Sequence, residues 1–346
     1  MDLFNIESYD YDLPEELIAQ NPADPRDSSR LMVLSRESGG ICHTVFSSLG
    51  EHLREGDLLL LNDTRVIPAR LPGKKIPGGG RTEALLLKAL DPGLLKWKAL
   101  VRPGRKTPPG TRIALGDGTE IMAGERLEEG VRIIYFPPGT DVMSLLGRLG
   151  ETPLPPYITR SSAPPSSYQT VFAKNDGSAA APTASLHFTA PMLERLRNET
   201  GVRTAWLTLH VGLGTFRPVK CADLRNHRIH EEFCVLPEET RDLVLETRSA
   251  GGRVIAAGTT AARTLESFAC EDGNLDCGEK ITELFVYPGY RFKVTDGLIT
   301  NFHLPRSSLL MLTAAFAGYG PVMGAYREAV ALGYRFFSFG DAMFIT

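Results

Sequence analysis

A block of short apolar segments constrains the fold most, because it interrupts a longer stretch with a different pattern. Residues 82–136 contain five runs typical of strands, EALLLKAL, LKWKALVR, TRIAL, TEIMA and VRIIYF, separated by DPG, PGRKTPPG and GDG turns. This pattern predicts an antiparallel meander or a small barrel. The Gly- and Pro-rich stretches LPGKKIPGGGR and ETPLPPY bracket the block, and such stretches are natural joints for an inserted domain.

After the second joint, helix patterns alternate with apolar strands, which predicts an α/β domain. Helices are expected over residues 191–199, 238–250, 261–268 and 308–317. Strands are expected over residues 204–210, 253–257 and 298–302, and the earlier run 58–61 joins their sheet. The chain of 346 residues is long enough for two domains. We therefore predict a larger discontinuous α/β domain, 1–70 and 154–346, with a small, basic antiparallel β-barrel domain, 71–153, inserted in it.

Charge is distributed unevenly along the chain. The formal net charge is −3, yet residues 65–112 hold twelve Lys or Arg against two acids, Glu83 and Asp91. A basic face attracts a phosphate backbone because binding releases condensed counterions, so this segment favours a nucleic-acid partner. A solvated rim that keeps the protein soluble is the alternative.

Several classes of protein are not favoured. No stretch reaches the roughly 18 apolar residues of a membrane helix, and the acidic start MDLFNIESYDYDLPEE is unlike a secretion signal. We expect a cytoplasmic protein with no membrane partner. Five cysteines without a CxxC pair argue against a disulfide framework and a zinc ribbon. The sequence also lacks GxxxxGK[ST], GxSxG and a GxGxxG after a strand, which argues against a kinase, a serine hydrolase and a nicotinamide enzyme.

The predicted strand that ends at His210 runs into the glycine-containing segment GLGTFRP. Open α/β sheets bind ligands at the carboxyl ends of their strands, and Gly212 and Gly214 would let the backbone approach a ligand closely. His210 and Arg217 would flank that opening. A tight turn beside a buried histidine is the alternative.

The next strand repeats this arrangement. VIAAGTTAARTLE places Gly258, Thr259 and Thr260 at the amino end of a helix, with Arg263 one turn further. Free N–H groups and the helix dipole favour an anion there, so a ligand carboxylate or phosphate would fit. Ordinary threonine capping is the alternative.

HRIHEE contains His227, His230, Glu231 and Glu232. It has no third ligand at a diagnostic spacing, so we predict no metal site. A general base or a polar clamp remains open, as does a solvated turn.

The segment FVYPGYRFKVTDGLITNFHLP predicts an aromatic-rich hairpin followed by a strand that carries Asn301 and His303. Its aromatic residues would stack on a base or belong to the core; they are Tyr287, Tyr290 and Phe292. Four polar residues, 62–65, similarly follow the apolar run 58–61.

The whole chain resembles the S-adenosylmethionine:tRNA ribosyltransferase-isomerase family of the queuosine pathway. The resemblance rests on strings in order from end to end, among them LNDTRVIPARL, WKALVRPGRK, AAPTASLHFT, HVGLGTFRPV, HRIHEEF, GTTAARTLES, FVYPGYRFKVTDGLITNFHLP and AYREAVALGYRFFSFGDAM. Ser185 departs from the pattern, because the family usually has a glycine at that place.

The resemblance implies transfer and isomerisation of the ribose of S-adenosylmethionine onto 7-aminomethyl-7-deazaguanine at the tRNA wobble position. The products are epoxyqueuosine in tRNA, adenine and methionine. S-adenosylmethionine is then a cosubstrate, no cofactor is bound permanently, and the partner is a tRNA that bears the precursor base. The oligomeric state stays open, with a monomer as one option.

Combining this chemistry with the motifs leads us to expect the following roles. The ribose proton is removed by His210 or His230, whose unperturbed pKa of about 6.5 suits proton transfer at neutral pH. The methionine carboxylate is held by Thr259, Thr260 and Arg263. The sugar or the amine is oriented by Arg217 and Glu231. Further cosubstrate-binding candidates are Gly212, Gly214, Gly258, Asn301 and His303. The RNA phosphates meet Lys74, Lys75, Arg102 and Arg105.

Two rival functions stay open at this point. Another S-adenosylmethionine-dependent RNA-modifying enzyme, such as a methyltransferase, would release S-adenosylhomocysteine. A non-catalytic RNA-binding module would explain the basic segment and would consume no cosubstrate.

Overall fold

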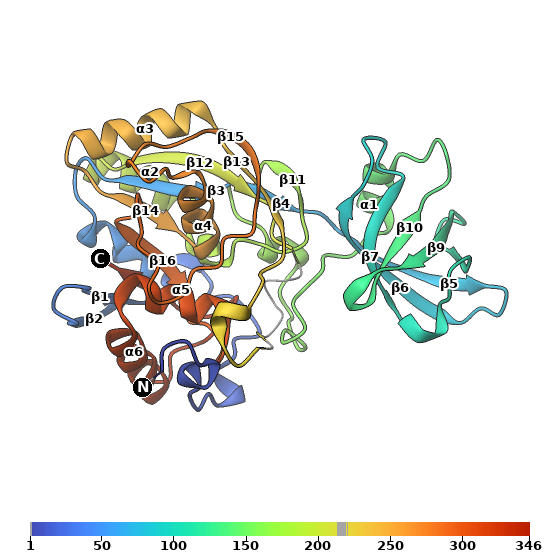
Figure 1. Cartoon of the computed structure of the whole chain (residues 1–346), viewed down its shortest axis with the longest axis horizontal. Helices are drawn as coiled ribbons and strands as arrows, with labels where there is room; N and C mark the ends of the chain where they lie inside the picture. Colours follow the sequence, from blue (N-terminus) through green and yellow to red (C-terminus); the bar gives the residue numbers. More distant parts are fainter. Residues whose placement is uncertain (1, 213–218, 220) are drawn as a thin grey trace. The chain divides into compact units, whose positions relative to one another are not determined.

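The computed structural model of the chain describes residues 2–212, 219 and 221–346. The chain divides into two compact units (Figure 1). Unit 1 comprises residues 1–64, 156–175 and 181–346, and unit 2 comprises residues 65–155 and 176–180. The predicted fold class is confirmed, because unit 1 is built on a large mixed sheet with helices and unit 2 on a closed antiparallel barrel. The predicted domain limits, 1–70 with 154–346 and 71–153, stay a prediction.

A nine-stranded sheet in the order β15-β13-β12-β3-β14-β16-β17-β1-β2 organises unit 1. Its strands are β1 (Arg30–Leu34), β2 (Ile41–Val45), β3 (Leu58–Asn62), β12 (Arg203–Leu209), β13 (Glu232–Leu236), β14 (Val254–Ala257), β15 (Gly278–Thr282), β16 (Gly297–Asn301) and β17 (Ala342–Ile345). The central strands β12, β3, β14 and β16 are mutually parallel. Their carboxyl ends therefore share one edge of the sheet.

Helices pack against this sheet because its central strands are apolar on both sides. They are α2 (Ala190–Thr200), α3 (Glu238–Ser249), α4 (Thr259–Phe268), α5 (Ser308–Ala317) and α6 (Tyr319–Ala331). All of β3 is buried; Leu59 and Leu61 join a cluster with Met192 and Leu196 of α2. Alternate residues of a strand point to opposite faces, so Leu58 and Leu60 face the other side, where α3 and α4 contact β3.

Local signals explain where these elements begin and end. The Thr189 hydroxyl caps α2 by accepting from the Met192 N–H at 3.3 Å, and Gly201 ends the helix in the left-handed conformation with φ 69°. The predicted helices and strands of this unit are present, with limits shifted by one or two residues. Among the described residues no single helix is long and apolar enough to cross a membrane; α5 and α6, bent by 120° at their junction, meet the length and composition criteria only as a pair.

The barrel of unit 2 closes in the order β10-β7-β6-β5-β8-β9. Its elements are β5 (Arg70–Ile76), β6 (Arg81–Ala89), β7 (Lys96–Arg102), β8 (Arg112–Ala114), β9 (Glu120–Arg126), β10 (Val131–Tyr135) and helix α1 (Val142–Leu149). Trp97, Leu86 and Ile134 belong to its buried core. A separate two-stranded sheet pairs β4 (Thr64–Val66) with β11 (Asn175–Ser178).

The structure corrects two sequence expectations. LPGKKI is not a joint: it forms β5, where a Cβ on Gly73 would lie 2.6 Å from Ile113 Cγ2, so the glycine permits close approach of β8. The aromatic segment 284–296 is not a hairpin. The Glu266 carboxylate on α4 accepts the backbone N–H groups of Lys293, Val294 and Thr295 at 2.8–3.1 Å and thereby replaces the ladder partners that a hairpin needs.

Candidate functional site

Polar residues or a glycine end or follow each of the four parallel strands at one edge of the sheet. Asn62 ends β3, His210 follows β12, Gly258 follows β14, and Asn301 ends β16. Because the strands are parallel, these four positions lie along a single edge. The structure thus brings together strand ends that are far apart in the sequence.

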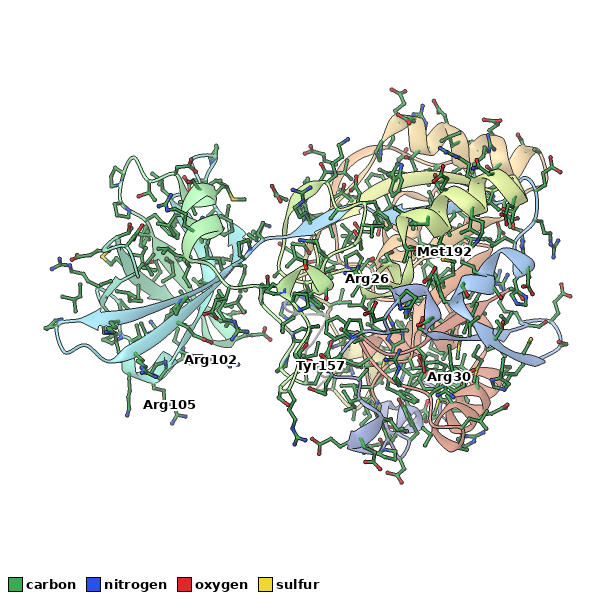
Figure 2. All side chains as sticks on the ribbon, turned by 180° about the vertical axis from the view of Figure 1, so that it is seen from behind. Arg26, Arg30, Arg102, Arg105, Tyr157 and Met192 are labelled. Carbon is green, nitrogen blue, oxygen red and sulfur yellow. The ribbon has the colours of Figure 1, made fainter. Side chains whose placement is uncertain are left out.

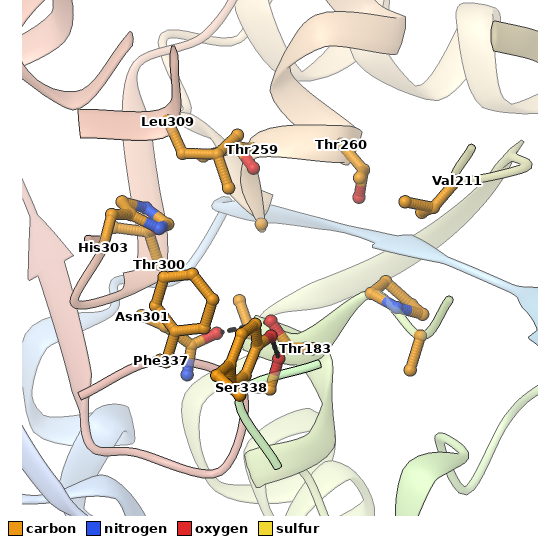
Figure 3. A pocket seen from close by; sticks show the side chains of 15 residues that line it. Thr183, Val211, Thr259, Thr260, Thr300, Asn301, His303, Leu309, Phe337 and Ser338 are labelled. Carbon is orange, nitrogen blue, oxygen red and sulfur yellow. Dashed lines mark hydrogen bonds between the residues drawn. The ribbon is translucent and has the colours of Figure 1, made fainter. Parts of the chain in front are cut away.

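A pocket opens at this edge, with about 550 Å³ of empty space including its mouth (Figure 3). The lining residues are Tyr157, Ala181, Pro182, Thr183, Ala184, Val211, Gly258, Thr259, Thr260, Thr300, Asn301, His303, Leu309, Phe337 and Ser338. Five of the predicted cosubstrate-binding residues are among them: Gly258, Thr259, Thr260, Asn301 and His303. Hydroxyl groups and an amide alternate here with aromatic and aliphatic surface, as in pockets for small organic ligands.

The amino end of α4 forms one wall of the pocket. Gly258, with φ 107°, turns the chain from β14 into the helix, and because it has no side chain it cannot cap the first N–H groups. Asn62 Nδ2 donates to Thr260 Oγ1 at 3.2 Å and to the Leu209 carbonyl at 3.1 Å. This amide therefore ties β3, β12 and α4 together at the pocket.

A second wall comes from the end of β16. Thr183 Oγ1 donates to Asn301 Oδ1 at 2.9 Å (Figure 3). Two residues further, His303 Nε2 lies 2.8 Å from Thr300 Oγ1, and the His303 N–H donates to the Tyr326 hydroxyl at 3.0 Å. Burial lowers the pKa of His303 to about 3, so its imidazole is neutral near pH 7.

The third wall is aromatic and contains a strained residue. Phe337 has φ 73°, a conformation that costs free energy for a residue with a side chain. Hydrogen bonds hold it there, because its N–H donates to the Phe302 carbonyl and its carbonyl accepts the Gly340 N–H, both at 2.9 Å. Its ring packs edge-on against Tyr157, whose hydroxyl is hydrogen-bonded to Ser338.

No sequence pattern predicted this aromatic wall or the short 3₁₀ turn Thr183–His187. Neither follows a predicted strand, and neither shows a helical or strand period, so the strand-end signal did not include them. Ser185, in that turn, has no positive φ; its hydroxyl donates to the Ala257 carbonyl at 3.2 Å, directly before Gly258.

His210 lies beside the pocket rather than in its lining. Its Nδ1 is 2.8 Å from Thr64 Oγ1, and its ring stacks on Phe233 with centroids 5.6 Å apart. The neighbouring Val211 reaches the pocket. The His210 N–H donates to the Phe233 carbonyl, which places His210 close in register to the start of β13.

His230 and Glu231 immediately precede β13, and both are exposed. The strand register therefore brings them near His210, although 20 residues separate them in sequence. The nearby His227 is half-buried, and its pKa is lowered by burial and by His230. Gly214 and Arg217, two further predicted residues, lie outside the described part of the chain.

Arg263 does not enter the pocket. It is 3% exposed, its guanidinium pairs with Glu232, and its Nε donates to the Leu284 carbonyl at 3.0 Å. Glu232 is also buried, and its Oε1 accepts the Gly212 N–H at 3.0 Å. The Glu232 carboxylate therefore engages both of the predicted residues Arg263 and Gly212.

The predicted RNA contacts all lie in unit 2. In the strand register, Lys74 of β5 lies opposite Arg81 of β6, and Arg102 of β7 lies opposite Glu83 of β6. This register places the end of β5 and the end of β7 at one end of the barrel. Lys75 Nζ donates to the Lys106 carbonyl at 2.8 Å, which joins it to the turn that carries Arg105. Arg102 and Arg105 are exposed at the rim of the unit (Figure 2).

Among residues 2–212, 219 and 221–346, no three His, Cys, Asp or Glu side chains are grouped so that they could hold a metal ion. The expected absence of a metal stays a prediction. A hydroxyl-rich pocket at the carboxyl ends of parallel strands defines a class: an α/β protein that binds a small organic molecule beside candidate histidine bases.

Comparison with known proteins narrows this class. A family model described as "Queuosine biosynthesis protein" matches residues 6–345. The S-adenosylmethionine:tRNA ribosyltransferase-isomerases of Symbiobacterium thermophilum and Halothermothrix orenii are 53% and 52% identical to the chain, each over 98% of it and 99% of their own length. The crystal structure of an S-adenosylmethionine tRNA ribosyltransferase from Thermotoga maritima is 42% identical and covers 98% of this chain and 100% of its own, with a TM-score of 0.56. The chain belongs to the queuosine biosynthesis protein family, so the resemblance drawn from its sequence is confirmed.

Proposed function

We propose that the chain transfers and isomerises the ribose of S-adenosylmethionine onto 7-aminomethyl-7-deazaguanine at the wobble position of tRNA, with release of adenine and methionine. The observation that carries the proposal is the 52–53% identity, over 98% of the chain, to relatives with that enzymatic name. A ligand-sized pocket at the expected edge of the sheet also supports it. The proposal includes a cytoplasmic location. It also assumes no permanently bound cofactor.

The chemistry fits a site without a nucleophile of its own. The sulfonium acidifies the adjacent ribose carbon and makes methionine a good leaving group, and the attacking amine belongs to the RNA. The protein must supply a base and a cradle for the cosubstrate. The pocket lining has hydroxyl and amide groups for the cradle, and histidines lie beside it.

In this proposal the amino end of α4 receives the methionine carboxylate. Its N–H groups and the positive end of the helix dipole favour an anion, and the hydroxyls of Thr259 and Thr260 lie at the same place. Arg263 acts indirectly, through Glu232, since its guanidinium is buried away from the pocket.

His210 and His230 are the proposed bases, with Glu231 and Arg217 orienting the sugar or the amine. The hydrogen bond between His210 Nδ1 and Thr64 Oγ1 fixes the orientation of the ring, which a proton transfer requires. For the RNA, the basic end of the barrel meets phosphates through Lys74, Lys75, Arg102 and Arg105.

Product analysis tests the proposal. The chain is incubated with S-adenosylmethionine and tRNA that carries the aminomethyl precursor, and the small products and the modified nucleoside are identified by mass. Free adenine, free methionine and epoxyqueuosine are expected. S-adenosylhomocysteine would instead identify a methyltransferase, and unchanged cosubstrate with bound tRNA would identify a binding module. A parallel reaction with unmodified guanine at the wobble position should release no adenine, because the attacking amine is missing.

A further inference from the structure

Asn301 lies on the pocket wall with both ends of its side-chain amide held by neighbours. Thr183 donates to Oδ1, and Nδ2 donates to Nε2 of His187 at 3.1 Å. Asn301 and His187 are 3% and 5% exposed. An amide side chain offers two N–H donors and two lone pairs on its oxygen. Within the described part of the chain, one N–H and one lone pair of Asn301 are therefore left for a ligand in the pocket.

His187 is the fixed end of this network. Its Nδ1 lies 2.7 Å from Ser29 Oγ, and its ring stacks on Phe46 with centroids 4.9 Å apart. Burial lowers the pKa of His187 to about 4; Asp341 opposes this shift, whereas Arg335 and Arg26 add to it, so the imidazole is neutral near pH 7. Nε2 faces an amide N–H and must accept, so the ring proton sits on Nδ1 and is donated to Ser29.

We propose that His187 is a positioning residue, which fixes the amide of Asn301 so that it offers one N–H donor and one oxygen acceptor to the adenine of S-adenosylmethionine. The inference rests on the proposed function. An asparagine amide pairs with the amino group and an adjacent ring nitrogen of adenine, because donor and acceptor match on each side. Phe337 and Leu309 line the same pocket and offer apolar surface to a purine ring.

The test compares binding of S-adenosylmethionine with binding of its inosine analogue, in which a carbonyl replaces the amino group at position 6. The wild-type protein should prefer the adenine form by about tenfold or more, the value of one hydrogen bond lost and one group left unpaired. His187→Met removes the acceptor for Asn301 Nδ2. Only Thr183 then holds the amide, and because a hydroxyl can donate or accept, both amide orientations become possible. The preference should fall to about twofold or less. His187→Gln retains a hydrogen-bonding oxygen and should recover most of the preference.

His43→Met is the matched control. His43 is hydrogen-bonded to Glu328 and Tyr334 at 2.8 Å and is not part of the pocket lining, so its replacement should leave the preference unchanged. Should His187→Met not fold, Ser29→Ala removes the partner of Nδ1, and the preference should again be reduced.

Two outcomes with the His187→Met protein overturn the inference: it keeps the wild-type preference, or it loses affinity for both ligands equally, which is the mark of a purely structural role. A wild-type protein that binds S-adenosylmethionine without preferring adenine also contradicts it but leaves the proposed function intact. A wild-type protein that binds neither ligand overturns the proposed function itself.

Discussion

His210 and His230 are the two histidines placed to serve as a base, and their surroundings differ. His210 is anchored by Thr64 and stacked on Phe233, whereas His230 is exposed just before β13. The stacked and less exposed imidazole of His210 is the better shielded from bulk water, so the larger effect is expected at His210.

Replacing each histidine by alanine tests this. Loss of a general base costs typically about 10²–10⁴ in rate, so His210→Ala should lower the rate of adenine release by at least about 100-fold, with a smaller effect for His230→Ala. His52→Ala, a half-buried histidine not in the pocket lining, is the control. An unchanged rate of adenine release in both variants would show that neither His210 nor His230 is the general base.

His187 also predicts how stability depends on pH. Its pKa is about 4 in the folded chain and about 6.5 when unfolded, so the unfolded chain binds more protons between these values. The free energy of unfolding is thus highest above pH 6.5 and falls as the pH drops toward 4. Between pH 6.5 and pH 4, the free energy of unfolding of His187→Gln should fall by about 3 kcal/mol less than that of the wild type, as measured by urea unfolding. Parallel pH curves for the two proteins would contradict the assigned burial.

At the scale of elements, the buried pair of Arg263 and Glu232 joins α4 to the start of β13 and holds the Gly212 N–H. Removing one partner of a buried pair leaves an uncompensated charge, so Arg263→Met should lower the free energy of unfolding by about 3–5 kcal/mol. Removing both charges, in Glu232→Leu with Arg263→Met, should recover part of this loss.

The control for this prediction is an exposed pair. Arg112 and Glu120 bridge β8 and β9 with side chains 59% and 39% exposed, so Arg112→Met should change the free energy of unfolding by about 1 kcal/mol or less. Equal losses in the Arg263 and Arg112 variants, measured by urea unfolding, would show that the buried pair has no special role in joining the elements.

The elements that position the pocket were predictable where the sequence is regular. The apolar runs before Gly258 and Asn301 predicted two strands and their carboxyl ends. Because these strands are parallel in the sheet, their carboxyl ends lie at the same edge. β5 was missed because Pro72 and Gly73 are typical of joints, while tertiary packing against β8 required the glycine. His187 was missed because its proposed role depends on a contact with Asn301, 114 residues away, which no local pattern encodes.

At the scale of the whole molecule, the uneven distribution of charge predicts that tRNA binding depends on the basic residues of the barrel. Arg102 and Arg105 are exposed at one end of the barrel, and each phosphate contact should contribute about 0.7–0.9 to the slope of log affinity against log salt concentration. Arg102→Gln with Arg105→Gln should therefore reduce that slope by about 1.5 in a titration with precursor tRNA.

A matched pair of replacements controls for net charge. Arg195 and Arg197 are exposed on α2 in unit 1, and changing both to glutamine removes the same charge from a different surface. For this double variant, the slope of log affinity for tRNA against log salt concentration should equal that of the wild type. Equal reductions in both double variants would mean that only overall charge matters, and that the barrel holds no phosphate-binding surface.

The most direct measurement follows the ribose itself. S-adenosylmethionine with ¹³C throughout its ribose is given to the protein with precursor tRNA, and the label is located by mass spectrometry of the digested RNA. The account predicts that all five labelled carbons reach the wobble nucleoside, with one adenine and one methionine released for each modified tRNA. Label that stays attached to adenine while the RNA gains only a methyl group would contradict it.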